Sequence, residues 1–261
     1  MVILTDSQPV PKDFCLPPAA SSLRLRGSLS FTTPCGREEQ SMDLSRTVAV
    51  PQPRPVSGGW GLAALSVAAL LAIGFVVEVA FPYLRLDPEA LARYSPRRWW
   101  LLAHITAGTI ALLIGPVQLW LGLSRRAMRV HRRLGVAYVA SVSVSSFAAF
   151  YLAAHTDLGW MFGAGITGLG VAWVVTTTMA IIAVRRGLIE QHRDWMIRSY
   201  VVTFAFVTFR VLWTLLKFAG VGTLREQLGV SAWFCWAVPL LVAEAVLQGR
   251  KMAGARRRSA P

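Results

Sequence analysis

Cysteine is scarce in this sequence, and the common catalytic motifs are missing. The three cysteines, Cys15, Cys35 and Cys235, lie far apart and form no CxxC pair. That spacing argues against a disulfide framework and against a zinc site, and it favours free thiols. The chain also has no glycine-rich phosphate loop, no HExxH and no GxSxG sequence. It therefore carries none of the motifs that would point to a nucleotide, metalloprotease or serine-hydrolase site.

Charged residues are few as well. They make up 15% of the chain, whereas 54% is hydrophobic, which is too apolar for a soluble domain of this length. The net charge of +14 would suit a nucleic-acid partner, but such proteins interleave basic and aromatic residues on a solvated face. Here the arginines cluster between apolar runs instead. The composition predicts a membrane protein whose partner is the lipid bilayer and not a nucleic acid.

Residues 1–59 contain no apolar run long enough to cross a membrane, and eight prolines interrupt them. No apolar centre follows a basic start, so a signal peptide is not expected. We predict a disordered, proline-rich cytosolic leader over this range. The alternative is that translation begins at Met42, in which case residues 1–41 are not part of the protein.

Six apolar stretches follow the leader, each about as long as the 20 residues that cross a hydrocarbon core of about 30 Å. Tryptophans lie near several of the expected ends, as in an interfacial aromatic belt. We predict an all-α, polytopic transmembrane helix bundle over residues 60–248 and a basic cytosolic tail over residues 249–261. The expected spans are Trp60–Phe81, Trp100–Leu123, Arg133–Ala154, Trp160–Val184, Trp195–Ala219 and Val230–Leu247.

The distribution of basic residues predicts the orientation. With six spans, the leader, the second and fourth loops and the tail share one side of the membrane. That side carries 19 lysines and arginines, against 6 on the opposite side. The positive-inside rule therefore places both termini in the cytoplasm, and we expect a multi-pass protein of the bacterial inner membrane. The basic tail needs no partner beyond anionic lipid head groups.

The four histidines separate by predicted depth. His104 and His155 lie towards the outer face, and His131 and His192 stand at the cytoplasmic starts of the third and fifth spans. Two histidine-ligated haem irons, one near each face, would need such an arrangement to carry electrons across the bilayer. The alternative, which is favoured for His131 and His192 taken alone, is that histidines beside arginines at a helix start are solvated interface residues. His155 lies in a short loop before Asp157, and for it a solvated position outside the membrane is strongly favoured.

One face of the second span is rich in small residues. His104, Gly108 and Gly115 recur at helical spacing with Gln118, so that they share a face. Such a stripe admits either a flat cofactor or another helix, and it would be the natural seam of a homo-oligomer. Helix packing explains the glycines but not His104 and Gln118.

Ionisable residues inside the predicted spans also indicate a candidate site, because a charge in the bilayer is costly without a partner. Arg210 and Glu78 have compatible predicted depths near the outer face, and Arg198 matches Glu244 near the inner face. We favour two interhelical ion pairs, with a proton or anion path as the alternative.

Three segments carry a family resemblance. They are "AHITAGTIALLIGPVQLWLG", "HRRLGVAYV" and "WVVTTTMAIIAVRRGLIEQHRDWMIRSYVVTFAFVTFRV". They resemble the bacterial family of predicted multi-pass membrane proteins called domain of unknown function 2306 (DUF2306). The resemblance covers residues 99–216 and implies an integral membrane helix bundle, without implying a reaction. The positions that match its pattern include His104, His131, His192, Arg198 and Arg210.

Two hypotheses of function follow. The first is a transmembrane redox protein that binds haem b through His104, His131 and His192 and exchanges electrons, with quinone as a candidate partner. The second is a non-enzymatic protein, either a small-solute or proton transporter that uses the region of Arg210 and Glu78, or an accessory subunit. The sequence assigns no catalytic residue.

Overall fold

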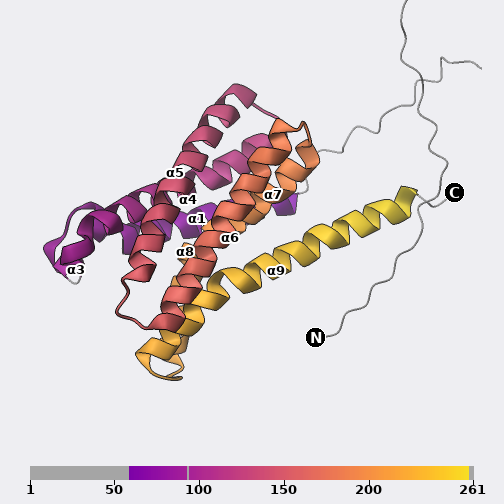
Figure 1. The fold of residues 1–261 in the computed structure, drawn as a ribbon. Coiled ribbons are helices and arrows are strands. Elements are labelled where there is room, and N and C mark those ends of the chain that lie inside the picture. Colours follow the sequence, from indigo (N-terminus) through magenta and orange to yellow (C-terminus); the bar gives the residue numbers. More distant parts are fainter. Residues whose placement is uncertain (1–58, 93, 259–261) are drawn as a thin grey trace, which may run out of the picture. The chain divides into compact units, whose positions relative to one another are not determined.

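The computed structural model describes residues 59–92 and 94–258, so the predicted leader lies outside the described residues apart from Gly59. Within these ranges every regular element is a helix (Figure 1). The elements are α1 (Gly59–Phe75), η1 (Val76–Ala80), α2 (Phe81–Leu84), α3 (Pro88–Ala92), η2 (Ser95–Arg97), α4 (Arg98–Ser124), α5 (Met128–Ala154), α6 (Trp160–Arg185), α7 (Ile189–Thr203), α8 (Ala205–Phe218) and α9 (Leu224–Arg258).

The prediction of six spans is confirmed. Six segments of the described chain are long and apolar enough to cross a membrane. The last residues of the second to fifth spans lie close to the predicted ones. The fifth span begins earlier than predicted, at Ile189 rather than Trp195, and the sixth extends well beyond Leu247. Both extensions are polar, so hydropathy alone does not detect them. Asp194 of the first extension and Lys251 of the second form an ion pair.

Short loops make successive spans antiparallel neighbours. α4 and α5 are joined by residues 125–127, where Arg125 and Ala127 both adopt left-handed backbone angles (φ 53° and 45°) that let the chain reverse tightly. α6 lies centrally and contacts α5, α7 and α9 (Figure 1). We call the end with loops 125–127 and 186–188 the basic end, and the end with loops 155–159 and 219–223 the α5–α6 end.

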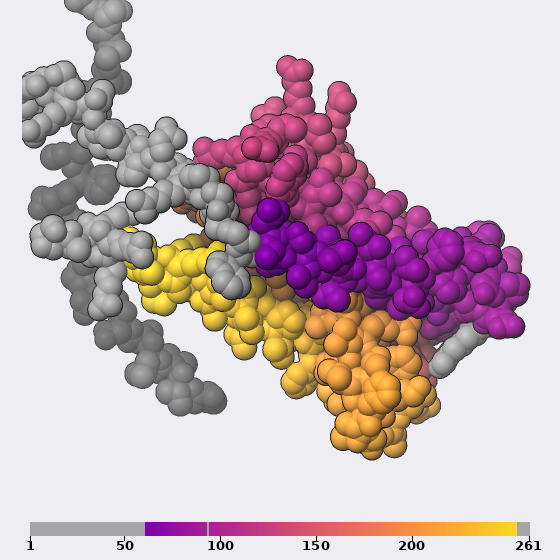
Figure 2. Space-filling model, turned by 180° about the vertical axis from the view of Figure 1, so that it is seen from behind, coloured from indigo at the N-terminus to yellow at the C-terminus, as the bar shows by residue number. Residues whose placement is uncertain are grey.

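The first span lies at the periphery. Figure 2 shows the α1 to α3 region across the surface of the bundle, and its main contacts are with α4. Only 6% of the apolar window of this span is buried, compared with 44% for α5. Large apolar side chains such as Leu70 and Val77 are therefore exposed, as expected of a helix that faces lipid.

Two spans contain an irregular segment. The first contains a π-helical segment, η1, which includes Glu78. The fifth is interrupted at Phe204 between α7 and α8. On either side of this break, Thr203 and Thr208 donate hydrogen bonds to carbonyl oxygens one turn back, at 2.9 and 3.0 Å, a contact that bends helices. Both irregular segments border the same cavity, described below.

The small-residue face of α4 receives aromatic rings from α7 and α8. A side chain at Gly115 would collide with the ring of Tyr200, and a Cβ at Gly108 would lie 3.1 Å from the ring of Phe206. These two glycines therefore let helices of the same chain approach closely.

Candidate functional site

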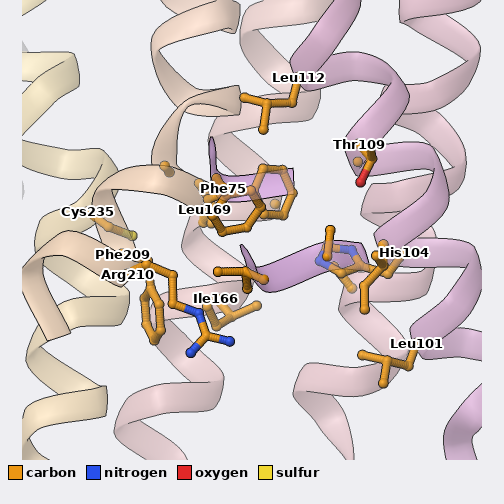
Figure 3. Close-up of a pocket in the computed structure, with 18 of the residues that line it drawn as sticks. Phe75, Leu101, His104, Thr109, Leu112, Ile166, Leu169, Phe209, Arg210 and Cys235 are labelled. Atoms are coloured by element: carbon orange, nitrogen blue, oxygen red, sulfur yellow. The ribbon is translucent and has the colours of Figure 1, made fainter. Parts of the chain in front are cut away.

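A cavity of about 230 Å³ lies between α4, α6 and α8, and residues of α1, η1, α2, α5, α7 and α9 also contribute to its wall. Most of the lining is apolar. His104 and Arg210 project into the space from opposite walls, and both lie towards the α5–α6 end (Figure 3). Leu112 lies about 12 Å deeper along α4, given a rise of 1.5 Å per residue. The cavity thus has one polar end and one apolar end.

His104 is held by Ser145 of α5. Its Nδ1 lies 3.0 Å from the backbone oxygen of Ser145, and the Ser145 hydroxyl donates to the backbone oxygen of His104, also at 3.0 Å. Ser145 Oγ also lies 3.0 Å from Nδ1. In the tautomer with hydrogen on Nδ1, the ring donates to the backbone oxygen, which can only accept, and Nε2 has a free lone pair. The ring of Phe206, 5.4 Å away, fixes the plane of the imidazole.

Arg210 has no carboxylate partner within 4.0 Å among residues 59–92 and 94–258. Its guanidinium lies over the ring of Trp213, 5.4 Å from the centroid. The pairing expected with Glu78 is not formed in the described chain, and Glu78 is exposed on the π-helical segment. A guanidinium inside a membrane without a counter-charge costs several kcal/mol. This arrangement favours an anionic or acceptor group in the cavity.

A second cavity, of about 190 Å³, adjoins the first at the α5–α6 end. We call it the loop cleft. Arg97 and Asp157 form an ion pair beside it, with Nη1 and Oδ2 3.4 Å apart. His104 lines both cavities, and other residues line both as well: Tyr94, Leu101, Ala149, Phe162 and Ile166.

The two histidines at the basic end, His131 and His192, lie outside both cavities. The Gln118 amide donates to the backbone oxygen of His131 at 2.8 Å, while Gln118 Oε1 and His131 Nδ1 are buried without a partner in the described chain. His192 Nδ1 lies 2.9 Å from the backbone oxygen of Ala180. His131 and His192 are close enough to interact electrostatically.

A hydroxyl network connects α5, α6 and α7 in the core. Tyr138 Oη lies 2.8 Å from Ser199 Oγ and 2.7 Å from Thr203 Oγ1, and Thr177 Oγ1 lies 2.8 Å from Ser199 Oγ. The indole of Trp173 donates to Thr203 at 2.9 Å. Because an indole N–H only donates, this link cannot accept a proton from the cavity that Trp173 lines. The network joins α5, α6 and α7.

Two ion pairs attach α7 to α9 near the basic end. Arg198 Nε donates to Glu244 Oε2 at 2.7 Å, and Lys251 Nζ lies 2.9 Å from Asp194 Oδ2. The depths of Arg198 and Glu244 suggest the first pair from the sequence. The second involves Lys251, which lies in the predicted tail, and nothing in the sequence suggests that the tail continues the helix.

The structure therefore separates the predicted site residues. His104 and Arg210 share a cavity, whereas His131 and His192 are neighbours at the basic end. His155 is exposed, and its ring stacks on Tyr151 at 4.3 Å. The described residues contain no group of three or more His, Cys, Asp or Glu that could hold a metal ion. Sequence reasoning misses Ser145, although its place in the serine-rich stretch "SVSVSS" of a span is an available signal.

Comparison with known proteins identifies a family. Residues 101–247 match the family described as predicted membrane protein (DUF2306), which confirms the resemblance noted in the sequence. The match covers more than half of the 261 residues, so the chain belongs to this family. No curated protein and no solved structure matches the chain.

Proposed function

From this family membership and the cavity, we propose that the protein is a non-enzymatic small-solute membrane protein that binds an organic acid with an apolar chain. One observation carries the proposal: Arg210, which has no carboxylate partner in the described chain, faces His104 at the polar end of an otherwise apolar cavity. A carboxyl group placed there would supply the missing counterpart.

In this proposal Arg210 and His104 contact the carboxyl group from opposite walls of the cavity. The Arg210 guanidinium donates to one oxygen in a charge-assisted hydrogen bond. When the ligand arrives as the carboxylate anion, His104 Nε2 takes up a proton from water and donates it in a hydrogen bond to the second oxygen. The alkyl chain then extends along the apolar wall towards Leu112 and Leu169. An acid of medium chain length has the required combination of one polar and one apolar end.

We also propose the orientation predicted from the basic residues. The basic end would face the cytoplasm and the α5–α6 end the opposite side, in a bacterial inner membrane. The support is the charge count, because the lysines and arginines outside the spans concentrate at the basic end. The polar end of the cavity would then face away from the cytoplasm.

A binding measurement tests the proposal. The full chain is reconstituted in lipid nanodiscs and titrated with 2-bromooctanoate, whose bromine quenches tryptophan on contact; Trp173 lines the cavity. We expect saturable quenching that octanoate relieves, octanol relieves weakly and octylammonium does not relieve. Arg210→Gln should weaken binding about 10- to 100-fold, the equivalent of about 1.5–3 kcal/mol for a hydrogen bond to a charged group.

Lys217→Gln is the matched control. Lys217 is a basic residue of the same helix, exposed and outside the cavity, so its replacement should leave binding unchanged. Equal competition by octanol and octanoate, or wild-type affinity in Arg210→Gln, would contradict the proposal.

Haem b is the second candidate. Its support is that His104 and His192 each direct Nδ1 at a backbone oxygen, the second contact that orients metal-ligating histidines. The fit is incomplete, because His104 is the one histidine in the wall of the described cavity, so no second imidazole faces it there. A reduced-minus-oxidised spectrum of the purified protein tests this candidate, and stoichiometric iron with a Soret band would establish it.

A further inference from the structure

We propose that the loop cleft is an entry subsite, which takes the carboxylate head group of the ligand from water and passes it to the cavity. This inference rests on the proposed function and adds a route and a residue pair to it. The charges of Arg97 and Asp157 would raise or lower the rate at which the acid enters.

The geometry of the two cavities supports a continuous route. They are separated by side chains that line both of them, among which His104 is polar. The loop cleft adds Thr156 and Asp157 of the α5–α6 loop and Arg97 of η2. The route therefore runs from the loop to His104 and from there to Arg210.

The order of charges along this route favours an anion. The side chain of Asp157 is 82% exposed and that of Arg97 only 28% exposed, so Asp157 is the more peripheral partner. While the pair is closed, the carboxylate neutralises Arg97. When it opens, Arg97 can attract a carboxylate ligand, and His104 and Arg210 lie further inward.

The pair is weak enough to open frequently. Its atoms are 3.4 Å apart and one partner is almost fully solvated. An ion pair of this kind shifts an equilibrium by no more than about fivefold, and salt screens it further. Opening it is therefore a small obstacle for a ligand that offers Arg97 a replacement carboxylate.

Lateral entry from the lipid is the competing route. α1 makes few contacts with α8, and both helices contribute to the cavity wall. A ligand that enters between them would not meet Arg97 or Asp157. The two routes therefore predict different kinetics for the same equilibrium affinity.

Stopped-flow quenching by 2-bromooctanoate in the same nanodiscs distinguishes the routes. With Asp157→Asn we expect entry about fivefold faster, and with Arg97→Gln about fivefold slower, while the dissociation constant changes less than the rates. Added salt should slow entry into Asp157→Asn, because Arg97 has lost its carboxylate partner there and salt screens its attraction for the anion.

Asp87→Asn is the matched control for net charge. Asp87 is an exposed acid of the loop that follows α2, and it does not line the loop cleft. Unchanged rates in Asp157→Asn and Arg97→Gln with normal affinity would overturn the entry subsite and favour lateral entry. Equal acceleration by Asp87→Asn and Asp157→Asn would reduce the effect to general surface charge and would also overturn it. Absence of saturable binding to the wild-type protein would instead refute the proposed function itself.

Discussion

Charged side chains inside this helix bundle differ in their partners between its two ends. At the basic end, Arg198 is paired with Glu244 and Asp194 with Lys251. Near the α5–α6 end, Arg210 has no carboxylate partner in the described chain and borders a cavity. Paired charges hold helices together, whereas a charge without a partner inside a membrane stabilises only when something else binds it. The comparison supports the proposal that the ion pairs near the basic end serve the fold and that the ligand binds near the α5–α6 end.

The largest effect is expected from Gly115→Val, which tests the packing between α4 and α7. Its side chain would overlap the ring of Tyr200, which lies in the core and cannot move freely. Overpacking of this kind costs about 1–3 kcal/mol or more, so we expect a clear fall in the thermal midpoint or loss of folded protein. Gly74→Ala is the control, because a Cβ there meets nothing within 4 Å. Similar midpoints for both variants would show that α4 and α7 are not tightly packed.

Replacing each arginine by methionine compares the two ends directly. Arg198→Met removes the partner of Glu244 and should lower stability by about 1–3 kcal/mol, since Glu244 is partly solvated. Arg210→Met removes a charge without a carboxylate partner and should leave stability unchanged or raise it, while octanoate binding is lost. Thermal unfolding of both variants in the same detergent measures the difference. An equal loss of stability in both would mean that Arg210 also serves the fold.

A smaller effect is expected in the hydroxyl network. Tyr138→Phe removes the oxygen that contacts both Ser199 and Thr203 and leaves their bonds incomplete. We expect a loss of about 1–2 kcal/mol, seen as a lower thermal midpoint, without a change in octanoate affinity. Tyr151→Phe serves as the control because Tyr151 lies only partly buried near the α5–α6 end. Reduced ligand affinity in Tyr138→Phe would instead assign the network to the site.

Sequence reasoning places the spans well where apolar length alone decides them. α4, α5 and α6 end within a few residues of the predicted boundaries, because a bilayer demands a fixed length of apolar helix. It places them less well where polar residues continue a helix. The stretch from Ile189 begins α7 although it reads as a charged collar, and its Asp194 is buried against Lys251 of α9.

The candidate site is only partly predictable. The membrane depths predicted from the sequence place His104 and Arg210 near the same face. Predicted depth does not show which helices are neighbours. Glu78 has a compatible depth and is exposed, whereas His104 faces the cavity. The rotation of each helix about its axis separates these cases, and it depends on packing between helices that are far apart in the chain.

The sequence by itself determined that this is an all-helical membrane protein with six spans, since composition and apolar length reflect the solvent that surrounds the chain. Only the tertiary structure decided that Arg198 forms an ion pair with Glu244 and that Arg210 forms none with Glu78. It also decided that His104 lines both the cavity and the loop cleft. The physical reason is that a span can be recognised from the residues of one helix. A site between helices forms only when the helices pack, because packing fixes which helices are neighbours and how each is rotated about its axis.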